Sequence, residues 1–261
     1  MNPGPVDPRH LPADTFVARV EHHAILDSTN DRAKQCAAGG PGPLPLLIVA
    51  DEQTAGRGRG ANRWWTGRGG LAFSLLLDHR GVHTDFGPGP LVSLCAAAAV
   101  VEAVIPLLPG RPVGIHWPND VFAAGGKLAG VLVEVLTHGL CVVGIGVNLN
   151  NTMVEAPAEL RQTATTLRDV TAKYHDPTLM LTSILRHFAG HVDQLRVAPA
   201  EVARLADRLC LQHGRTLCVE SAGGEIRGRC AGIAPDGALL LDTPGGRQRI
   251  VTGTLHRLEQ P

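Results

Sequence analysis

The sequence predicts an α+β fold in which a mixed sheet packs against helices and a small β-barrel follows at the C-terminal end. Up to about residue 210, strand-like runs rich in Val, Ile and Leu are interspersed with helical stretches. From Gly214 onward the pattern changes to short strands separated by glycine turns, which is typical of a small barrel. With 261 residues, 44% of them hydrophobic and 18% charged, the chain is globular and long enough to bury a sizeable core.

We therefore divide the chain into three parts. Residues 1–14 are polar and proline-rich and are expected to form a flexible leader, residues 15–210 a large ligand-binding domain, and residues 211–261 the C-terminal barrel. The leader lacks the apolar core of a signal peptide, and no apolar run approaches the ~18–20 residues that span a bilayer. We expect a cytoplasmic protein that binds no membrane.

The first half of the large domain begins with a strand, a capped helix and two further strands. The strands are predicted over residues 17–25, 44–50 and 71–77, and the helix ends at Ala38. Ser28 and Thr29 are suited to cap this helix, and capping alone would explain them as well as ligand contact does. The connection 51–70 is rich in glycine and arginine, and loops this long in a compact domain are usually functional or mobile.

The second half opens on an apolar stretch, 90–108, in which Glu102 is the only charge before the chain turns polar. It is predicted to be a helix buried on most faces. Strands follow over 113–117, 128–135 and 140–147, the last two forming a hairpin, and then helices over 178–195 and 199–209. The barrel turns are expected at 222–224, 235–237 and 244–246.

Charge and cysteine content exclude several classes of function. The 24 Lys and Arg residues equal the 24 Asp and Glu residues, which argues against nucleic-acid binding as the main activity. The six cysteines are scattered, with no C-x-x-C pair, and are expected to be free thiols.

Two segments predict a site for an anionic, phosphorylated small molecule. Arg57 and Arg59 alternate with glycines, which let backbone amides approach an anion while the guanidinium groups pair with it. Lys127 lies in a Gly-Gly turn before an apolar strand. Alone, the arginine loop would equally fit a solvated surface loop or an RNA-binding patch, and the lysine turn favours the ligand site.

The order of four motifs resembles that of biotin protein ligases. They are Gln-Thr-Ala-Gly-Arg-Gly-Arg at 53–59, Trp-Pro-Asn-Asp at 117–120, Gly-Lys-Leu-Ala-Gly-Val-Leu-Val-Glu at 126–134 and Gly-Ile-Gly-Val-Asn-Leu-Asn at 144–150. Asp-Ser-Thr-Asn at 27–30 also fits, and the resemblance runs from about Glu21 to the C-terminus. It implies a catalytic domain like that of class II aminoacyl-tRNA synthetases and an SH3-like barrel.

The resemblance also implies the reaction. Biotin is activated with ATP to biotinyl-5′-adenylate, pyrophosphate is released, and biotin is transferred to a lysine of a carrier protein. Both reacting groups of the first step are anions, so Lys127 and Arg59 are expected to be catalytic through charge stabilisation.

The expected ligand contacts combine the neutral polar groups with the two cationic segments. The biotin-binding residues are expected to be Ser28, Thr29, Asn30, Gln53, Gly56, Arg57, Gly58, Arg59, Lys127 and Gly130. The residues expected to bind ATP or the adenylate are Arg57, Arg59, Trp64, His116, Asn119, Asp120, Lys127 and Asn148.

Three of these residues leave alternatives open. Trp64 is expected to cover the ligand or stack on adenine, or else to belong to a satellite hydrophobic cluster. Asp120 would orient Lys127, hold the Mg²⁺ that accompanies ATP, or cap a turn. His116 stands where the family usually has a lysine, and it replaces that cation only when protonated or through a neutral N–H donor.

The expected partner is a biotin carboxyl carrier domain of acetyl-CoA carboxylase or a related carboxylase. Regulatory members of the family carry an N-terminal operator-binding domain, and the roughly twenty residues before the resemblance are too few for one, so no DNA binding is expected. A homodimer is left open, because related enzymes often dimerise and no surface pattern decides it. The rival interpretations are a lipoate ligase or octanoyltransferase, and a non-catalytic biotin or RNA binder.

Overall fold

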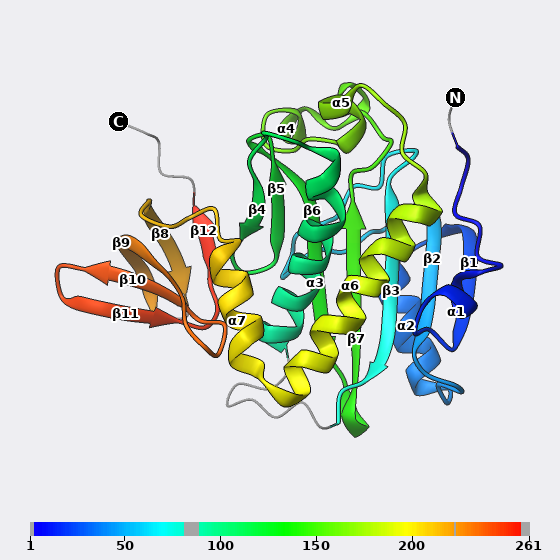
Figure 1. Ribbon diagram of the computed structural model, residues 1–261, viewed down its shortest axis with the longest axis horizontal. Helices are drawn as coiled ribbons and strands as arrows, with labels where there is room; N and C mark the ends of the chain where they lie inside the picture. Colours follow the sequence, from blue (N-terminus) through cyan, green and yellow to red (C-terminus); the bar gives the residue numbers. More distant parts are fainter. Residues whose placement is uncertain (1–2, 81–88, 222, 257–261) are drawn as a thin grey trace.

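The computed structural model describes residues 3–80, 89–221 and 223–256, which form two β-sheets with helices around the larger one. The larger sheet has seven strands in the order β1-β2-β3-β7-β6-β5-β4, and the smaller has five in the order β11-β10-β9-β8-β12. Figure 1 shows the smaller sheet at one end of the molecule, beyond α7 and β4. The predicted α+β class is confirmed.

The larger sheet is mixed, as predicted, because β1 and β2 are parallel and every other neighbouring pair is antiparallel. Its strands are β1 (Arg19–Leu26), β2 (Leu46–Gln53), β3 (Leu71–Asp78), β4 (Val113–His116), β5 (Asp120–Ala123), β6 (Gly126–Val135) and β7 (Leu140–Val147). The predicted hairpin is the β6–β7 pair. Strand β5 was not predicted, since its four residues begin inside a turn-forming Pro-Asn-Asp sequence.

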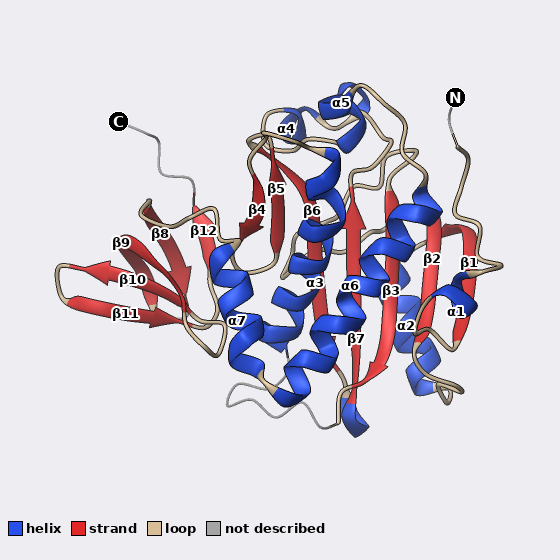
Figure 2. Cartoon of the chain, in the orientation of Figure 1, coloured by secondary structure: helices blue, strands red, loops and turns tan. Residues whose placement is uncertain are grey.

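Helices cover both faces of this sheet (Figure 2). Helices α3, α6 and α7 lie on one face, and α2 packs against β2, β3 and β7 on the other. The helices are α1 (Leu11–Asp14), α2 (Thr29–Ala38), α3 (Gly89–Val104), α4 (Ala158–Arg161), α5 (Leu167–Thr171), α6 (Pro177–Val197) and α7 (Pro199–Arg208). The short α1, α4 and α5 were not predicted, because four or five residues show no helical period.

Side chains of β2 point alternately to the two faces of the sheet, and this explains why the sequence of the strand is continuously apolar. Leu47 and Val49 belong to the large core on the α3 and α6 side, whereas Leu46 and Ile48 pack with Ala33 of α2 on the opposite side. Successive side chains of a strand point to opposite faces, so a strand covered on both faces is apolar throughout.

The exclusion of any membrane-length apolar run was wrong. Among the residues that the structure describes, the helical stretch Gly89–Leu107 is long and apolar enough to cross a bilayer, with a hydropathy of 2.0. Most of it is buried, and α3 contacts α6, α7, β4 and β6. A helix enclosed by protein on most faces is apolar for that reason, so α3 is the core helix predicted for this stretch.

The N-terminal segment packs on the domain that follows it. Of the expected leader, residues 3–14 are described; they include α1, and Val6 and Leu11 are buried in the large core. The backbone N–H of Asp7 donates to Thr178 Oγ1 of α6 at 2.9 Å. These contacts place the segment against α6.

The five C-terminal strands form an antiparallel sheet that is open in the described residues, whereas we expected a small SH3-like barrel. They are β8 (Thr216–Ser221), β9 (Gly224–Ile233), β10 (Leu239–Thr243), β11 (Gly246–Ile250) and β12 (Thr254–His256). Strands β11 and β12 are the two edges. Four of the five residues of β11 are exposed, so it lacks an apolar face with which to close a barrel. Position 222 of one expected turn and the last residues, 257–261, lie outside the described residues.

Backbone hydrogen bonds join β4 to the segment between α7 and β8, which leads into the smaller sheet. The N–H of Ile115 donates to Leu209 O at 2.8 Å, and the N–H of Leu211 donates to Ile115 O at 2.9 Å. Trp117 is 1% exposed, and its Nε1 donates to Gly237 O at 2.9 Å, in the turn before β10. This junction fixes the C-terminal sheet beside the end of β4.

Candidate active site

The predicted site residues gather around one cavity of about 1510 Å³ between the large sheet and the C-terminal sheet. Among the predicted residues, Gly56 and Asn148 do not line it. The others do, and they are Ser28, Thr29, Asn30, Gln53, Arg57, Gly58, Arg59, Trp64, His116, Asn119, Asp120, Lys127 and Gly130. The fold therefore unites segments that lie up to about a hundred residues apart in the sequence.

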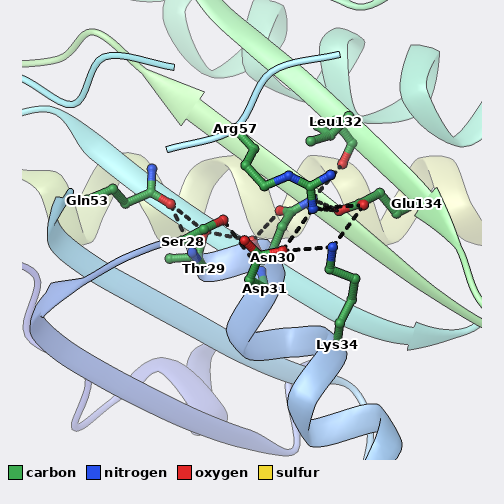
Figure 3. A network of polar contacts seen from close by, with 10 residues as sticks. Ser28, Thr29, Asn30, Asp31, Lys34, Gln53, Arg57, Leu132 and Glu134 are labelled. Atoms are coloured by element: carbon green, nitrogen blue, oxygen red, sulfur yellow. Dashed lines mark hydrogen bonds and ion pairs between the residues drawn. The ribbon is translucent and has the colours of Figure 1, made fainter. Parts of the chain in front are cut away.

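One end of the cavity carries a network of neutral polar groups (Figure 3). The Thr29 N–H donates to Gln53 Oε1 at 2.9 Å, and Gln53 Nε2 donates to Thr66 Oγ1 at 3.1 Å. The buried Ser74 Oγ lies 2.7 Å from both Thr29 Oγ1 and Asn30 Oδ1. Neutral groups held in this way can pair with a polar, uncharged ring without the cost of burying a charge. Ser74 was not predicted, because it lies within an apolar strand.

Ser28 has both of the predicted roles available to it. It is the N-cap of α2, accepting from the Asp31 N–H, and it also lines the cavity while only 2% exposed. Its capping bond is long, at 3.4 Å, so the hydroxyl is weakly held by the helix.

The guanidinium of Arg57 is paired with carboxylates. Its Nη1 lies 2.8 Å from Asp31 Oδ1 and 3.0 Å from Glu134 Oε1, as Figure 3 shows. Burial acts to raise the pKa of Glu134, but hydrogen bonds from Asn30 and Lys34 and the charge of Arg57 outweigh it, so the pKa is lowered. Glu134 is therefore an anion at neutral pH.

Lys127 and Asp120 form an ion pair across the β5–β6 hairpin. Lys127 Nζ lies 2.8 Å from Asp120 Oδ2 and 5.8 Å from the ring centre of Trp64. The orienting role that we considered for Asp120 agrees with this geometry. Its other oxygen, Oδ1, is buried and has no hydrogen-bond partner within the described part of the chain. An unpartnered carboxylate oxygen is a ready acceptor for a ligand group or a cation.

Glycines on the large sheet make room for two of these side chains. A Cβ at Gly146 would lie 2.3 Å from Trp64 Cε2, and one at Gly144 would lie 1.9 Å from Asn30 Oδ1. The Trp64 ring thus packs against β7 at Gly146 and lines the cavity. The space above these two glycines is filled by the side chains of Trp64 and Asn30.

Arg59 connects the loop to the C-terminal sheet. Its Nη2 donates to the carbonyl oxygen of Gly253, just before β12. Burial lowers the pKa of the Arg59 guanidinium, against the opposing charge of Asp120. Because arginine keeps its proton even so, Arg59 is a half-buried cation within the electrostatic reach of Asp120.

Four predicted residues are engaged by the protein itself. The ring of His116 stacks on Phe122, with ring centres 4.5 Å apart. Asn119 Nδ2 donates to Val131 O at 2.6 Å. Asn148 Nδ2 donates to the Lys127 carbonyl at 3.3 Å. Gly56 packs on the backbone of Trp64, where a Cβ would lie 2.5 Å from the carbonyl oxygen. Asn148 and Gly56, which do not line the cavity, thus support residues that do.

The cavity has further cations that the sequence did not indicate. Arg63 of the loop, Arg215 just before β8 and Arg227 of β9 also line it. The sequence around Arg215 and Arg227 does not indicate a binding site. These two residues reach the cavity only because the C-terminal sheet packs beside the large sheet. Within the described residues, no group of three or more His, Cys, Asp or Glu side chains has the arrangement of a metal site.

Comparison with known proteins agrees with this architecture. The biotin/lipoate A/B protein ligase family matches residues 24–150, and the biotin protein ligase C terminal domain matches residues 213–254. A biotin–[acetyl-CoA-carboxylase] ligase of Mycobacterium tuberculosis is 34% identical over 232 residues, which are 88% of this chain and 85% of the relative. A biotin–[acetyl-CoA-carboxylase] ligase of Paracoccus denitrificans is 34% identical over 236 residues, which are 87% of this chain and 95% of the relative.

A solved structure shares the fold over nearly the whole chain. It is the biotin protein ligase of Aquifex aeolicus in complex with biotin and ATP, with a TM-score of 0.81 and 29% identity, covering 92% of this chain and 100% of that one. The fold is that of the biotin and lipoate protein ligases. With the C-terminal match and the two relatives, the chain belongs to the biotin protein ligase family and is a biotin ligase enzyme.

Proposed function

We propose that this enzyme activates biotin with ATP and then transfers it to a specific lysine of a biotin carboxyl carrier domain. The carrier is that of acetyl-CoA carboxylase or a related carboxylase, in agreement with the names of the two relatives. The observation that carries the proposal is the Lys127–Asp120 pair beside Trp64, in the cavity whose far end is neutral and polar.

In the first step an oxygen of the biotin carboxylate attacks the α-phosphorus of ATP. The bond from that phosphorus to the bridging oxygen breaks, and pyrophosphate leaves. Both reactants are anionic, and charge spreads over the α-phosphate as the reaction proceeds. Lys127 and Arg59 supply fixed positive charge for it, while Ser28, Thr29 and Gln53 hold the ureido ring of biotin.

In the second step the carrier lysine, as a free amine, attacks the carbonyl carbon of the adenylate. The bond from that carbon to the phosphate oxygen breaks, AMP leaves, and the nitrogen loses a proton as the amide forms. No further energy source is needed, because the mixed anhydride already carries the activation. Trp64 lines the cavity, and a cover formed by its ring over the adenylate would protect the anhydride from hydrolysis.

Mg²⁺ fits this site as a companion of ATP. Asp120 Oδ1 is buried and has no partner among the residues that the structure describes, and Mg²⁺ is commonly held by one or two carboxylates together with substrate phosphates. Asp120 would hold the ion, which neutralises phosphate charge when bound. Asp120 contacts Lys127 through its other oxygen, Oδ2, so the carboxylate can serve both functions.

The remaining parts of the proposal concern organisation. The two family matches support a catalytic domain over residues 15–210 and a C-terminal domain over 211–261. The cavity is lined from both, which supports a role for the C-terminal domain in closing the site. We also propose a cytoplasmic location, where carboxylases and ATP are available, and a homodimer as one assembly to be tested by light scattering.

The decisive experiment is to incubate the purified chain with biotin, ATP and Mg²⁺ and to analyse the products by mass spectrometry. We expect biotinyl-adenylate and pyrophosphate, and biotin on the carrier lysine once a carrier domain is added. Lipoic acid in place of biotin is the control for the rival ligase activity. Biotin binding without adenylate would refute the enzymatic proposal, and preferential use of lipoic acid would refute the choice of substrate.

A further inference from the structure

Four charged side chains form a closed ring beside the neutral end of the cavity (Figure 3). Arg57 contacts both Asp31 and Glu134, and Lys34 Nζ contacts the same two oxygens at 2.7 Å and 3.1 Å. Each cation thus has two carboxylate partners and each carboxylate two cations, with no net charge. The ring ties together α2, the loop after β2, and β6.

Glu134 connects this ring to the neutral network. Besides its two cations, its Oε2 accepts a hydrogen bond from Asn30 Nδ2 at 2.8 Å. Asn30 is 4% exposed, and the absence of a side chain at Gly144 gives its amide the space that it occupies. Glu134 itself is about one-fifth exposed, so its contacts are only partly screened by water.

The carboxylate fixes the direction of the hydrogen bonds that follow it. An ionised carboxylate only accepts, so the Asn30 amide turns its NH₂ toward Glu134 and its oxygen toward Ser74. The Leu132 carbonyl, 3.4 Å from Asn30 Nδ2, is a second and weaker acceptor on the same side. Ser74 Oγ lies 2.7 Å from both Asn30 Oδ1 and Thr29 Oγ1 and has one proton. If it gives that proton to Asn30 Oδ1, its oxygen is left to accept from the Thr29 hydroxyl, whose other acceptor, Gln53 Oε1, is farther away at 3.2 Å. A glutamine at position 134 could donate or accept, so only the long bond to the Leu132 carbonyl would then favour this direction.

We propose that Glu134 is a positioning residue for the biotin pocket: it orients Asn30 and, through Ser74, the hydroxyl of Thr29. The pocket then presents one fixed pattern of donors and acceptors to the ureido ring of biotin. Naming biotin as the ligand rests on the proposed function. The charge of Arg57 is matched within the ring, so its main task is to hold the loop against α2 and β6.

The test is isothermal titration calorimetry of the full chain with biotin alone and with ATP alone. Glu134→Gln should weaken biotin binding about tenfold, because a mispaired buried group is left in the pocket, while ATP affinity stays within about twofold. The matched control is Glu155→Gln, at an exposed glutamate, which should change neither affinity. Thermal unfolding of every variant shows that it is folded.

Two further variants distinguish the orienting of Asn30 by Glu134 from a general contribution of the charged ring to stability. Asn30→Asp combined with Glu134→Gln moves the carboxylate one link closer to Ser74 and restores an obligatory acceptor there. It should recover biotin affinity at least threefold relative to Glu134→Gln. Lys34→Met opens the ring but keeps the Glu134 carboxylate, so it should lower the melting temperature with little change in biotin affinity.

Biotin affinity within twofold of the parent for folded Glu134→Gln would overturn the inference, and so would equal losses of biotin and ATP affinity. If Glu134→Gln does not fold, Glu134→Asp is measured in its place, because it retains a carboxylate acceptor. Its biotin affinity should be near that of the parent, and a tenfold loss of biotin affinity would contradict the inference. A parent that binds biotin but makes no adenylate refutes the proposed reaction and leaves this inference standing.

Discussion

Replacing Lys127 by Ala is the sharpest test of the catalytic assignment. The side chain is one-third exposed and lies 2.8 Å from Asp120, so it is a partly desolvated cation inside the cavity. Removing one preorganised group that faces developing charge costs ~100–1000-fold in rate, and partial exposure of Lys127 places the expected loss near ~100-fold, about 2.7 kcal/mol.

Stability should change much less. Partly exposed ion pairs contribute about 0–1 kcal/mol, which corresponds to a shift of roughly 2–4 °C in melting temperature for a chain of this size. The Lys127 backbone is held independently, because its N–H donates to Thr163 O at 2.9 Å and its carbonyl accepts from the Thr165 N–H at 3.0 Å.

The assay is pyrophosphate release under saturating biotin and ATP, with Lys173→Ala, at an exposed lysine, as the control. A folded Lys127→Ala protein that releases pyrophosphate at near the parent rate would refute the assignment of Lys127. A loss confined to the KM for biotin would show that Lys127 only binds the substrate.

Three other predictions follow from the same contacts. Gly146→Ala should push Trp64 off β7 and speed adenylate release severalfold, whereas Gly190→Ala, which meets no neighbour, should not. Arg59→Ser should loosen adenylate retention more than it slows synthesis, measured by filter binding and pyrophosphate release. Burial alone would raise the pKa of Glu134, but its partners lower it below 4.5, so its stabilisation is present above that pH and is lost as the pH falls further. Urea unfolding at pH 7 and pH 3 should therefore show a smaller acid loss for Glu134→Gln than for the parent.

Local sequence determined most of the fold. The six predicted strands of the large sheet and the helices α2, α3, α6 and α7 were found because their periodicity and caps are encoded in consecutive residues. Strand β5 and the one-turn helices were not predicted, because four or five residues are too few to show a periodic pattern of apolar side chains. The apolar run of α3 shows the limit of composition, because only packing distinguishes a core helix from a membrane span.

The sequence by itself also determined that the cavity would contain both cationic and neutral polar side chains. The arginine loop, the lysine turn and the neutral residues of the Asp-Ser-Thr-Asn motif can all be identified directly in the sequence. Only the tertiary structure decided what each group contacts. It pairs Arg57 with Glu134 and Lys127 with Asp120, and it fills the space over Gly146 with Trp64. Charge pairing depends on distances of a few ångström between distant segments, and such distances are set by sheet order and packing, which motif spacing does not contain.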